Sequence, residues 1–396
     1  MADVPLVVIC ADGTAPDYLD AAVAHGRMPV FERMRRDGTY ALARAAIPSF
    51  TNPNNVTIVT GQPPARHGFA GNYFYDEASG VEVMMDHPRF LRCDSWLARL
   101  AATGQRVAAI PAKDKLRAIV GAGWRGICFS GELAQATTEA EHGIADVPAR
   151  VGRPVPGMYS GQMSDFVMHC GVYLLRQRLA DVVYLSLTDF VQHTFAPGAP
   201  EADAFYAALD ARLAELDALG AVFVLTADHG MNDKSRPDGT PNVVNLEEIL
   251  RSCVAGPVRV VLPITDPHVT HHAGLGSFAS IHLPADQAPA ALQRLREAPA
   301  IDAALLRAEA AERFELPADR IGDIVVLSGR DAVLGRHPRA HDLSQLRGAR
   351  LRSNGGLHEV TVPFLVNRRL TPAYAERLGR LRNADAFPVG LDGVVA

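Results

Sequence analysis

The chain has 396 residues, of which 48% are hydrophobic and 21% charged, so we expect a folded globular protein and exclude a disordered one. Its formal net charge is -5 and it carries no long basic run, which excludes the electrostatic footprint of a nucleic-acid-binding or membrane-surface protein. We therefore expect small molecules to be its partners.

Cysteine usage and the first apolar run indicate the compartment. The five cysteines are odd in number, widely spaced and without a C-x-x-C pair, which favours reduced thiols over a disulfide framework. The apolar run from Val4 to Ala11 has no basic region and stops at Asp12, so it predicts a buried strand and not a signal peptide. No apolar segment is long enough to span a bilayer. We expect a cytoplasmic protein.

Strand-like and helix-like segments alternate up to about Cys253. Short apolar runs occupy residues 6–10, 107–110, 182–187 and 222–225. Amphipathic stretches occupy residues 28–36, 95–102, 165–179 and 202–219. This alternation predicts an α/β fold with a mainly parallel sheet between helices, placed in a core domain of residues 1–256.

The pattern changes after residue 256. Two strand-like runs and two helical stretches predict a small α+β cap at residues 257–323, and residues 324–396 are expected to return to the core. The cap contains His268, His271 and His272, which we interpret as parts of a hydrated loop because none follows a core strand.

Polar residues follow each of the four apolar runs of the core. They are Asp12 after the first run, Lys113 and Lys115 after the second, Asp189 after the third, and Asp228 with His229 after the fourth. In an open parallel sheet, ligands bind outside the carboxyl ends of the strands. The sequence therefore predicts one site that gathers carboxylates, an imidazole and two amines.

Several of these residues have the spacing of metal ligands. Asp189 and His193 lie one helical turn apart, which suits two ligands of one ion, and His358 follows a pair of glycines that allows a sharp turn. The candidate ligands are Asp12, Asp189, His193, Asp228, His229 and His358. This mixed oxygen and nitrogen set suits zinc and is large enough for two ions. Taken singly, Asp12 also fits a turn or a helix cap, Asp228 with His229 a simple turn, and His358 an ordinary buried histidine. Asp189 with His193 also fits an exposed contact between residues one helical turn apart.

Thr51 is the candidate nucleophile. Pro53 is suited to the first turn of a helix that runs on to Gly61, so Thr51 is expected at the helix N-terminus. Free amides and the helix dipole favour a phosphoryl anion there, and metal coordination would activate the hydroxyl. The alternative is that Thr51 is only a helix cap.

Two stretches resemble the alkaline phosphatase superfamily, in particular its nucleotide pyrophosphatase/phosphodiesterase and phosphonoacetate hydrolase branches. They are Pro48-x-x-Thr51-x-Pro53-Asn54 with Thr60-Gly61-x-x-Pro64-x-x-His67-Gly68, Asn72 and Tyr75-Asp76, and, downstream, Thr226-Ala227-Asp228-His229-Gly230-Met231. The resemblance implies two zinc ions, one held by Asp12, Asp228, His229 and the Thr51 oxygen, and the other by Asp189, His193 and His358. It also implies that Asn72 holds a phosphoryl oxygen. Glu359 departs from the family pattern, because many phosphodiesterases have glycine after the last histidine ligand.

The segment Ala112-Lys113-Asp114-Lys115-Leu116-Arg117 looks most like the phosphonoacetate hydrolase branch. That branch implies cleavage of the carbon–phosphorus bond of phosphonoacetate through a phosphothreonine, giving acetate and phosphate. We expect Lys113 and Lys115, two apart in an extended segment, to point the same way and stabilise the carbanion that leaves. The open alternatives are a phosphodiesterase or phosphatase on the same site, a non-catalytic metal-dependent binding protein, and two merely solvated lysines. A homodimer is the candidate assembly.

Overall fold

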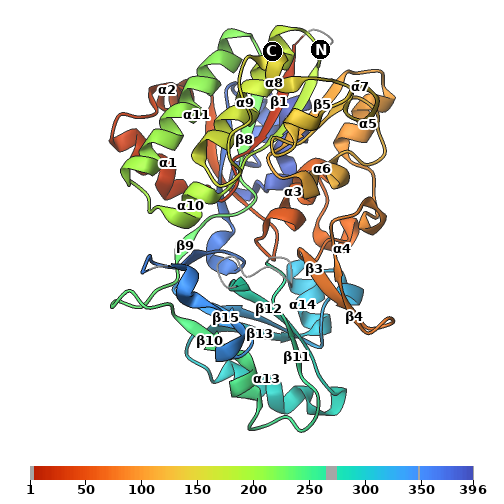
Figure 1. Cartoon of the computed structure of the whole chain (residues 1–396), viewed down its shortest axis with the longest axis vertical. Helices are drawn as coiled ribbons and strands as arrows, with labels where there is room; N and C mark the ends of the chain where they lie inside the picture. Colours follow the sequence, from red (N-terminus) through yellow and green to blue (C-terminus); the bar gives the residue numbers. More distant parts are fainter. Residues whose placement is uncertain (1–3, 265–273, 347, 396) are drawn as a thin grey trace.

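The computed structural model describes residues 4–264, 274–346 and 348–395, and has a large lobe above a smaller one (Figure 1). The large lobe is built on a seven-stranded sheet in the order β2-β17-β8-β1-β7-β5-β6. These strands are β1 (Leu6–Cys10), β2 (Thr39–Arg44), β5 (Val107–Pro111), β6 (Ile127–Cys128), β7 (Val182–Ser186), β8 (Val222–Thr226) and β17 (Thr361–Val366). Neighbours from β8 to β6 are parallel, whereas β17 is antiparallel to β8 and β2. The predicted mainly parallel sheet is confirmed.

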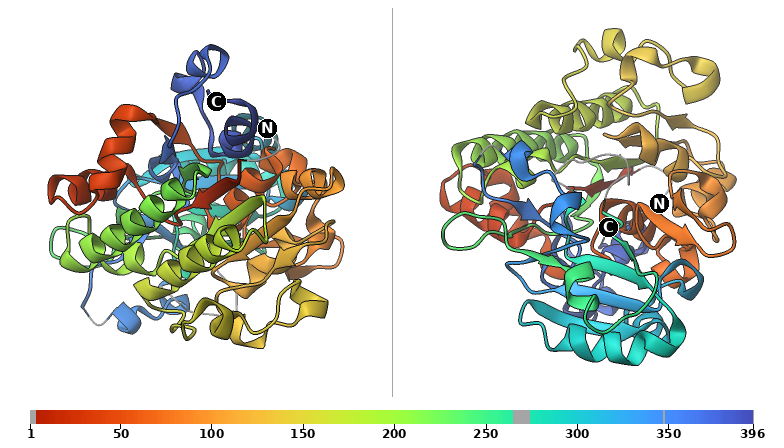
Figure 2. Two further views of the ribbon diagram at one scale, coloured as in Figure 1. Left: turned by 90° about the horizontal axis from the view of Figure 1, so that it is seen from above. Right: turned by 60° about the horizontal axis from the view of Figure 1, so that its bottom comes forward.

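Helices cover both faces of this sheet, which is why its central strands are apolar throughout. In β1, Val7 and Ile9 pack into one buried cluster, and Leu6, Val8 and Cys10 pack into the other. The first face carries α1 (Pro16–Ala24), α2 (Pro29–Asp37), α9 (Gly161–Arg176) and α11 (Pro200–Ala218), the last two side by side (Figure 2). The second face carries α3 (Thr51–Thr60), α5 (Trp96–Ala102), α6 (Asp114–Val120) and α16 (Ala386–Asp392). The four helices predicted in the core are confirmed, with small shifts at their ends.

Helix α3 places the candidate nucleophile at its first residue. Pro53 is tolerated because an amide in the first turn has no partner within the helix. The helix ends at Gly61, whose φ of 67° lies in the left-handed region that glycine adopts at low cost. The predicted start and stop of this helix are therefore confirmed.

The smaller lobe is an α+β cap. Its antiparallel sheet has the order β11 (Arg259–Val261), β12 (Phe278–His282), β14 (Ile324–Ser328) and β13 (Ile301–Leu306), with α13 (Ala288–Arg296) and α14 (Arg307–Phe314) packed on it. The predicted boundary at residue 323 is wrong, because β14 pairs with β12 and β13. The predicted start at residue 257 is late, since Leu246 and Leu250 of α12 (Leu246–Leu250) already belong to the apolar cluster of the cap. The chain rejoins the main sheet only at β17.

Several shorter elements complete the two lobes. They are the hairpin β3 (Tyr73–Asp76) and β4 (Val81–Met84), the pair β9 (Asn232–Asp233) and β16 (Arg352–Ser353), the pair β10 (Val243–Asn245) and β15 (Val333–Gly335), and the helices α4 (Pro64–His67), α7 (Glu139–His142), α8 (Val147–Val151), α10 (Phe190–Thr194) and α15 (Pro372–Ala375). Among the described residues, no helix has the length and apolar character needed to cross a membrane. The three histidines predicted to lie in a cap loop fall outside the described residues.

Candidate active site

Four adjacent strands deliver the predicted polar residues to one edge of the main sheet. In the order β8-β1-β7-β5, they are followed by Asp228 with His229, by Asp12, by Asp189 and by Lys113. The strands end level with one another, since Cys10 at the end of β1 pairs with Thr226 on one side and Ser186 on the other. The structure brings these side chains together, as predicted for the carboxylates, the imidazole and one of the two amines.

Asp12, Asp228 and His229 form a buried cluster of potential metal ligands. Each offers one ligand atom, and these atoms lie within 4.8 Å of one another. His229 Nε2 lies 3.3 Å from Asp12 Oδ1 and 3.6 Å from Asp228 Oδ2. His229 Nδ1 lies 2.9 Å from the carbonyl oxygen of Gly230, which can only accept a hydrogen bond. Nδ1 therefore carries the proton, and Nε2 is left to bind a metal.

Thr51 lies beside this cluster. Its Oγ1 is 3.4 Å from His229 Nε2. The residue at the N-cap position of α3 is Phe50, and no side chain caps the helix there. Thr51 is thus the first helical residue, and the alternative that it serves only as a cap is wrong.

Asp189 and His193 form a second candidate ligand pair. Their side chains are about one-tenth exposed, and His193 Nε2 lies 3.0 Å from Asp189 Oδ2. His193 Nδ1 donates to the carbonyl of Arg352 at 2.9 Å, which again leaves Nε2 facing the carboxylate. The one-turn spacing seen in the sequence does bring the two side chains together.

Lys113 joins the two groups of candidate ligands. Its Nζ lies 3.0 Å from Asp189 Oδ1 and 3.5 Å from Asp12 Oδ2. Burial acts to lower the pKa of Lys113, but the two carboxylates outweigh it and raise the pKa above its ordinary value. Burial acts to raise the pKa of Asp189, but Lys113 and His193 hold that pKa well below its ordinary value.

The cluster concentrates more negative charge than its own side chains neutralise. Burial and the neighbouring Asp12 carboxylate raise the pKa of Asp228 well above its ordinary value. The pKa of His229 rises to about 10 because Asp228 and Asp12 outweigh the opposing effect of burial. Asp12 Oδ1 is buried and receives no hydrogen bond from the described residues. Buried carboxylate oxygens of this kind, beside imidazole Nε2 atoms, fit a divalent metal ion.

The structure does not bring the His358 side chain to the other candidate ligands. Its Nε2 lies 2.6 Å from Asp302 Oδ2 in the cap, and its side chain is 37% exposed. The cause is its neighbour Glu359, which points inward and forms a fully buried ion pair with Lys234 at 2.8 Å. Because the Glu359 side chain points into the interior from this short turn, the neighbouring His358 side chain points outward.

The structure also places the two predicted lysines and Asn72. Lys113 is the N-cap residue of α6, and Lys115 is exposed within that helix, so they do not lie two apart in an extended segment. Lys113 has an extended backbone just before the helix, and the shared direction of the two lysines stays a prediction. Asn72 is 5% exposed, and its Nδ2 donates to the backbone carbonyl of Ile264 while its Oδ1 has no donor among the described residues.

The sequence interpretation missed Asn354. This buried residue follows β16, two positions after Arg352, whose carbonyl binds His193. Its Nδ2 donates to the carbonyl of Ser49, two positions before Thr51, at 2.8 Å, and its Oδ1 has no donor among the described residues. Asn354 therefore contacts the nucleophile segment and lies two residues along the chain from the partner of His193. The only signal in the sequence was the flexible Gly-Gly pair that follows it.

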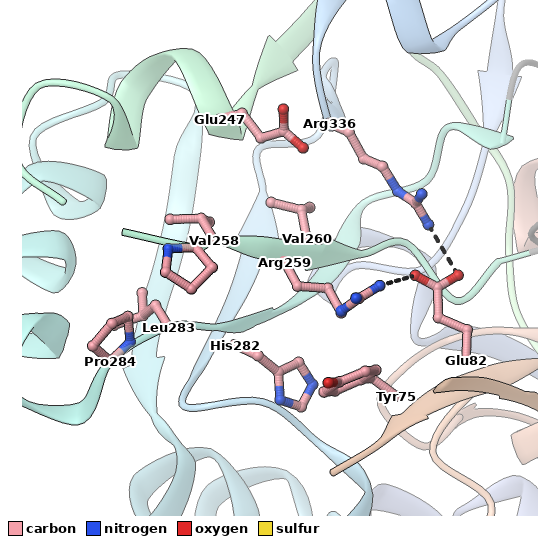
Figure 3. Close-up of a pocket in the computed structure, with 11 residues that line it drawn as sticks. Tyr75, Glu82, Glu247, Val258, Arg259, Val260, His282, Leu283, Pro284 and Arg336 are labelled. Carbon is pink, nitrogen blue, oxygen red and sulfur yellow. Dashed lines mark hydrogen bonds and ion pairs between the residues drawn. The ribbon is translucent and has the colours of Figure 1, made fainter. Parts of the chain in front are cut away.

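A cavity of about 430 Å³ lies elsewhere, between the cap and the hairpin β3–β4 (Figure 3). Arg259 and Arg336 both point to Glu82 there, at 3.1 and 3.6 Å, so this one carboxylate already pairs with both guanidinium groups. A nearby group of potential ligands, Glu77, His282 and Asp323, is likewise held by Arg307, which pairs with both of its carboxylates. The cluster at the sheet edge remains the candidate active site.

Known structures share this fold. Phosphonoacetate hydrolase from Sinorhizobium meliloti 1021, solved with phosphonoformate, is 48% identical with a TM-score of 0.93, over 98% of this chain and 95% of that one. The same hydrolase solved with phosphonoacetate gives 47% identity and a TM-score of 0.92 over the same shares of the two chains. Human ectonucleotide pyrophosphatase/phosphodiesterase 5, at 14% identity and a TM-score of 0.65 over 97% of this chain and 93% of that one, shares the fold. The predicted alkaline-phosphatase-like α/β fold is confirmed.

Curated relatives match over shorter stretches. An uncharacterized pyrophosphatase/phosphodiesterase of Schizosaccharomyces pombe is 31% identical over 91 residues, which is 23% of this chain and 18% of that protein. An ectonucleotide pyrophosphatase/phosphodiesterase of Caenorhabditis elegans is 31% identical over 109 residues, 26% of this chain and 14% of that one. The matches thus span less than a fifth of the length of these two relatives. The sequence pattern of type I phosphodiesterases and nucleotide pyrophosphatases, however, matches residues 6–350. The chain belongs to the type I phosphodiesterase/nucleotide pyrophosphatase family.

Proposed function

We propose that this protein hydrolyses the carbon–phosphorus bond of phosphonoacetate to acetate and phosphate with two zinc ions. The S. meliloti phosphonoacetate hydrolase, 48% identical over nearly the whole chain, supports the reaction. The observation that carries the proposal is the position of Lys113, whose ammonium lies between Asp12 and Asp189 and so between the two groups of candidate ligands. A phosphonate bound across these groups would have its carboxylate within reach of a partly buried cation.

The candidate ligands divide into two sets. Asp12, Asp228, His229 and the Thr51 oxygen would hold one ion, and Asp189 with His193 would hold the other. In place of His358, the Asn354 Oδ1 is a candidate oxygen ligand for the second ion, since it is buried without a donor beside both segments. When bound, zinc supplies positive charge that lowers the pKa of the Thr51 hydroxyl and neutralises phosphonate oxygens.

The chain's own residues then carry the reaction. Thr51 Oγ1 attacks phosphorus, and the electron pair of the carbon–phosphorus bond leaves with the acetate carbon. Lys113, with Lys115 nearby in sequence, binds the carboxylate over which this charge spreads, which lowers the barrier for departure. The Thr51 hydroxyl proton passes to water, and the carbanion takes up a proton from water to give acetate. Water then cleaves the phosphothreonine, which frees Thr51 and releases phosphate. Asn72 binds a phosphoryl oxygen throughout.

Replacement of the two lysines tests this assignment. We expect Lys113→Ala to lower kcat/KM for phosphonoacetate by about a hundredfold or more, because it removes a charge that stabilises the transition state. Lys115→Ala should have a smaller effect, since its side chain is exposed. Parent-level turnover in both variants would refute the role of the lysines.

A phosphodiesterase on the same site is the second candidate, and the family match favours it. In that case Lys113 would bind a second acidic group of the substrate. Higher activity on a nitrophenyl phosphate diester than on phosphonoacetate would support this alternative, and Lys113→Ala would then leave the diester activity largely intact.

We further propose a cytoplasmic location. All five cysteines are free, and burial raises the pKa of Cys170 and Cys10 above the ordinary value, which suits inert thiols in a reducing compartment. Cell fractionation with an antibody against the protein tests the location.

A further inference from the structure

A buried tyrosine hydroxyl reaches toward the candidate active site from inside the main sheet. Tyr184 is the middle residue of β7, pairs with Val8 of β1 and is fully buried. Its hydroxyl donates to Oδ1 of Asn55 in α3 at 2.6 Å. A polar group at this depth needs a partner, and here a strand of the sheet supplies the donor and the nucleophile's helix supplies the acceptor.

Asn55 also forms hydrogen bonds with two residues of the candidate site. Its side chain is also fully buried, and its Nδ2 donates to the carbonyl oxygen of Thr51 at 2.9 Å and to Asp228 Oδ2 at 3.4 Å. The other oxygen of Asp228 accepts from the backbone amides of Gly13 and His229, at 3.2 and 3.0 Å. The Asp228 carboxylate is thus held by backbone on one oxygen and by Asn55 on the other.

The contacts of Asn55 fix which way its amide faces. Thr51 O and Asp228 Oδ2 can only accept, so the NH₂ group must face them and Oδ1 must face Tyr184. Without the tyrosine hydroxyl, Oδ1 would be a buried acceptor with no donor, and the amide would gain by turning away. A turned amide would place Asn55 Oδ1 against the Asp228 carboxylate, and the two oxygen atoms would repel each other.

We propose that Tyr184 and Asn55 are positioning residues that fix the Asp228 carboxylate relative to Thr51 and so set the metal affinity of the site. This inference rests on the proposed metal site, but not on the identity of the substrate. Groups that orient a metal ligand through hydrogen bonds typically change metal affinity by about 10- to 100-fold. A tyrosine that served only to stabilise the core would leave metal affinity unchanged.

The test is zinc titration of metal-free protein against a competing chromophoric chelator, together with kcat and KM on phosphonoacetate. Tyr184→Phe keeps the ring and removes one oxygen, so we expect about 10- to 100-fold weaker zinc binding and a lower kcat with little change in KM. Tyr206→Phe is the matched control, because Tyr206 is also fully buried and its hydroxyl bonds Thr14 and Gln192 at 3.0 and 2.8 Å, neither of them a candidate ligand. It should lower the melting temperature comparably and keep the parent's zinc affinity.

A double variant tests whether Tyr184 acts through Asn55. Asn55→Ala alone should weaken zinc binding, and Tyr184→Phe added to it should weaken zinc binding no further. Parent-like zinc affinity in Tyr184→Phe, or an equal further loss in the double variant, would overturn the inference. If Tyr184→Phe does not fold, parent-like zinc affinity in Asn55→Ala overturns it as well. A parent protein that binds zinc but releases no phosphate from phosphonoacetate would refute the proposed reaction alone.

Discussion

Removal of Lys234 should destabilise the protein strongly, because it leaves a buried charge without a partner. Lys234 and Glu359 are both fully buried side chains joined at 2.8 Å. Lys234 Nζ also donates to the carbonyl of Arg330 at 2.8 Å, while Glu359 accepts from the amide of Gly356 at 2.9 Å and from Asn232 Nδ2 at 2.6 Å. Breaking such a pair from one side costs about 3–5 kcal/mol, because the remaining carboxylate stays in a low-dielectric interior.

The measurement is denaturant unfolding of Lys234→Met, monitored by circular dichroism. The double variant Lys234→Met/Glu359→Gln should regain most of the lost free energy of unfolding, since it removes both charges. Arg350→Met is a control from the same region, because Arg350 pairs with Asp233 at the surface and should contribute about 1 kcal/mol or less. A loss below about 1 kcal/mol in Lys234→Met, or a double variant less stable than the single, would refute the reasoning.

Three further predictions concern single side chains. Burial, and to a smaller extent Arg320, lower the pKa of His67 to about 3. Below about pH 6.5 the unfolded chain therefore binds a proton at His67 that the folded chain does not bind. Stability should therefore fall by up to about 2 kcal/mol between pH 7 and 5, and melting curves of His67→Gln should show a shallower pH dependence. Thr51→Ala should lower phosphate release by at least about a thousandfold while Thr51→Ser keeps part of it, and equal rates in Thr51→Ala and the parent would contradict its role. His358→Ala should keep the parent's zinc content, measured by elemental analysis, whereas His193→Ala should lose one ion; the opposite result would restore His358 as a ligand.

The sequence was informative wherever a local pattern determined the outcome. An apolar strand followed by a polar residue predicts a sheet edge in any parallel arrangement, so Asp12, Asp189 and Asp228 could be grouped without coordinates. The start of α3 was equally predictable, because Pro53 and Gly61 restrict the backbone locally.

Pairings between distant segments could not be predicted in the same way. The strand β14 is a run of buried apolar residues, and such a run fits the main sheet and the cap sheet equally well. The outward position of His358 could not be predicted, because the buried contact between Glu359 and Lys234 joins residues far apart in the sequence. Asn354 and Asn55 carry no pattern of their own, and only their buried contacts reveal them.

Phosphate release by zinc-loaded protein tests whether the site cleaves a carbon–phosphorus bond with the help of Lys113. Phosphonoacetate, a nitrophenyl phosphate ester and a phosphonate without a carboxylate would be compared side by side, for the parent and for Lys113→Ala. We expect fastest release from phosphonoacetate by the parent, and loss of that preference in Lys113→Ala, because the lysine acts on the carboxylate of the leaving group. Faster release from the ester, with the same preference in both proteins, would contradict carbon–phosphorus cleavage and assign the site to phosphate ester hydrolysis.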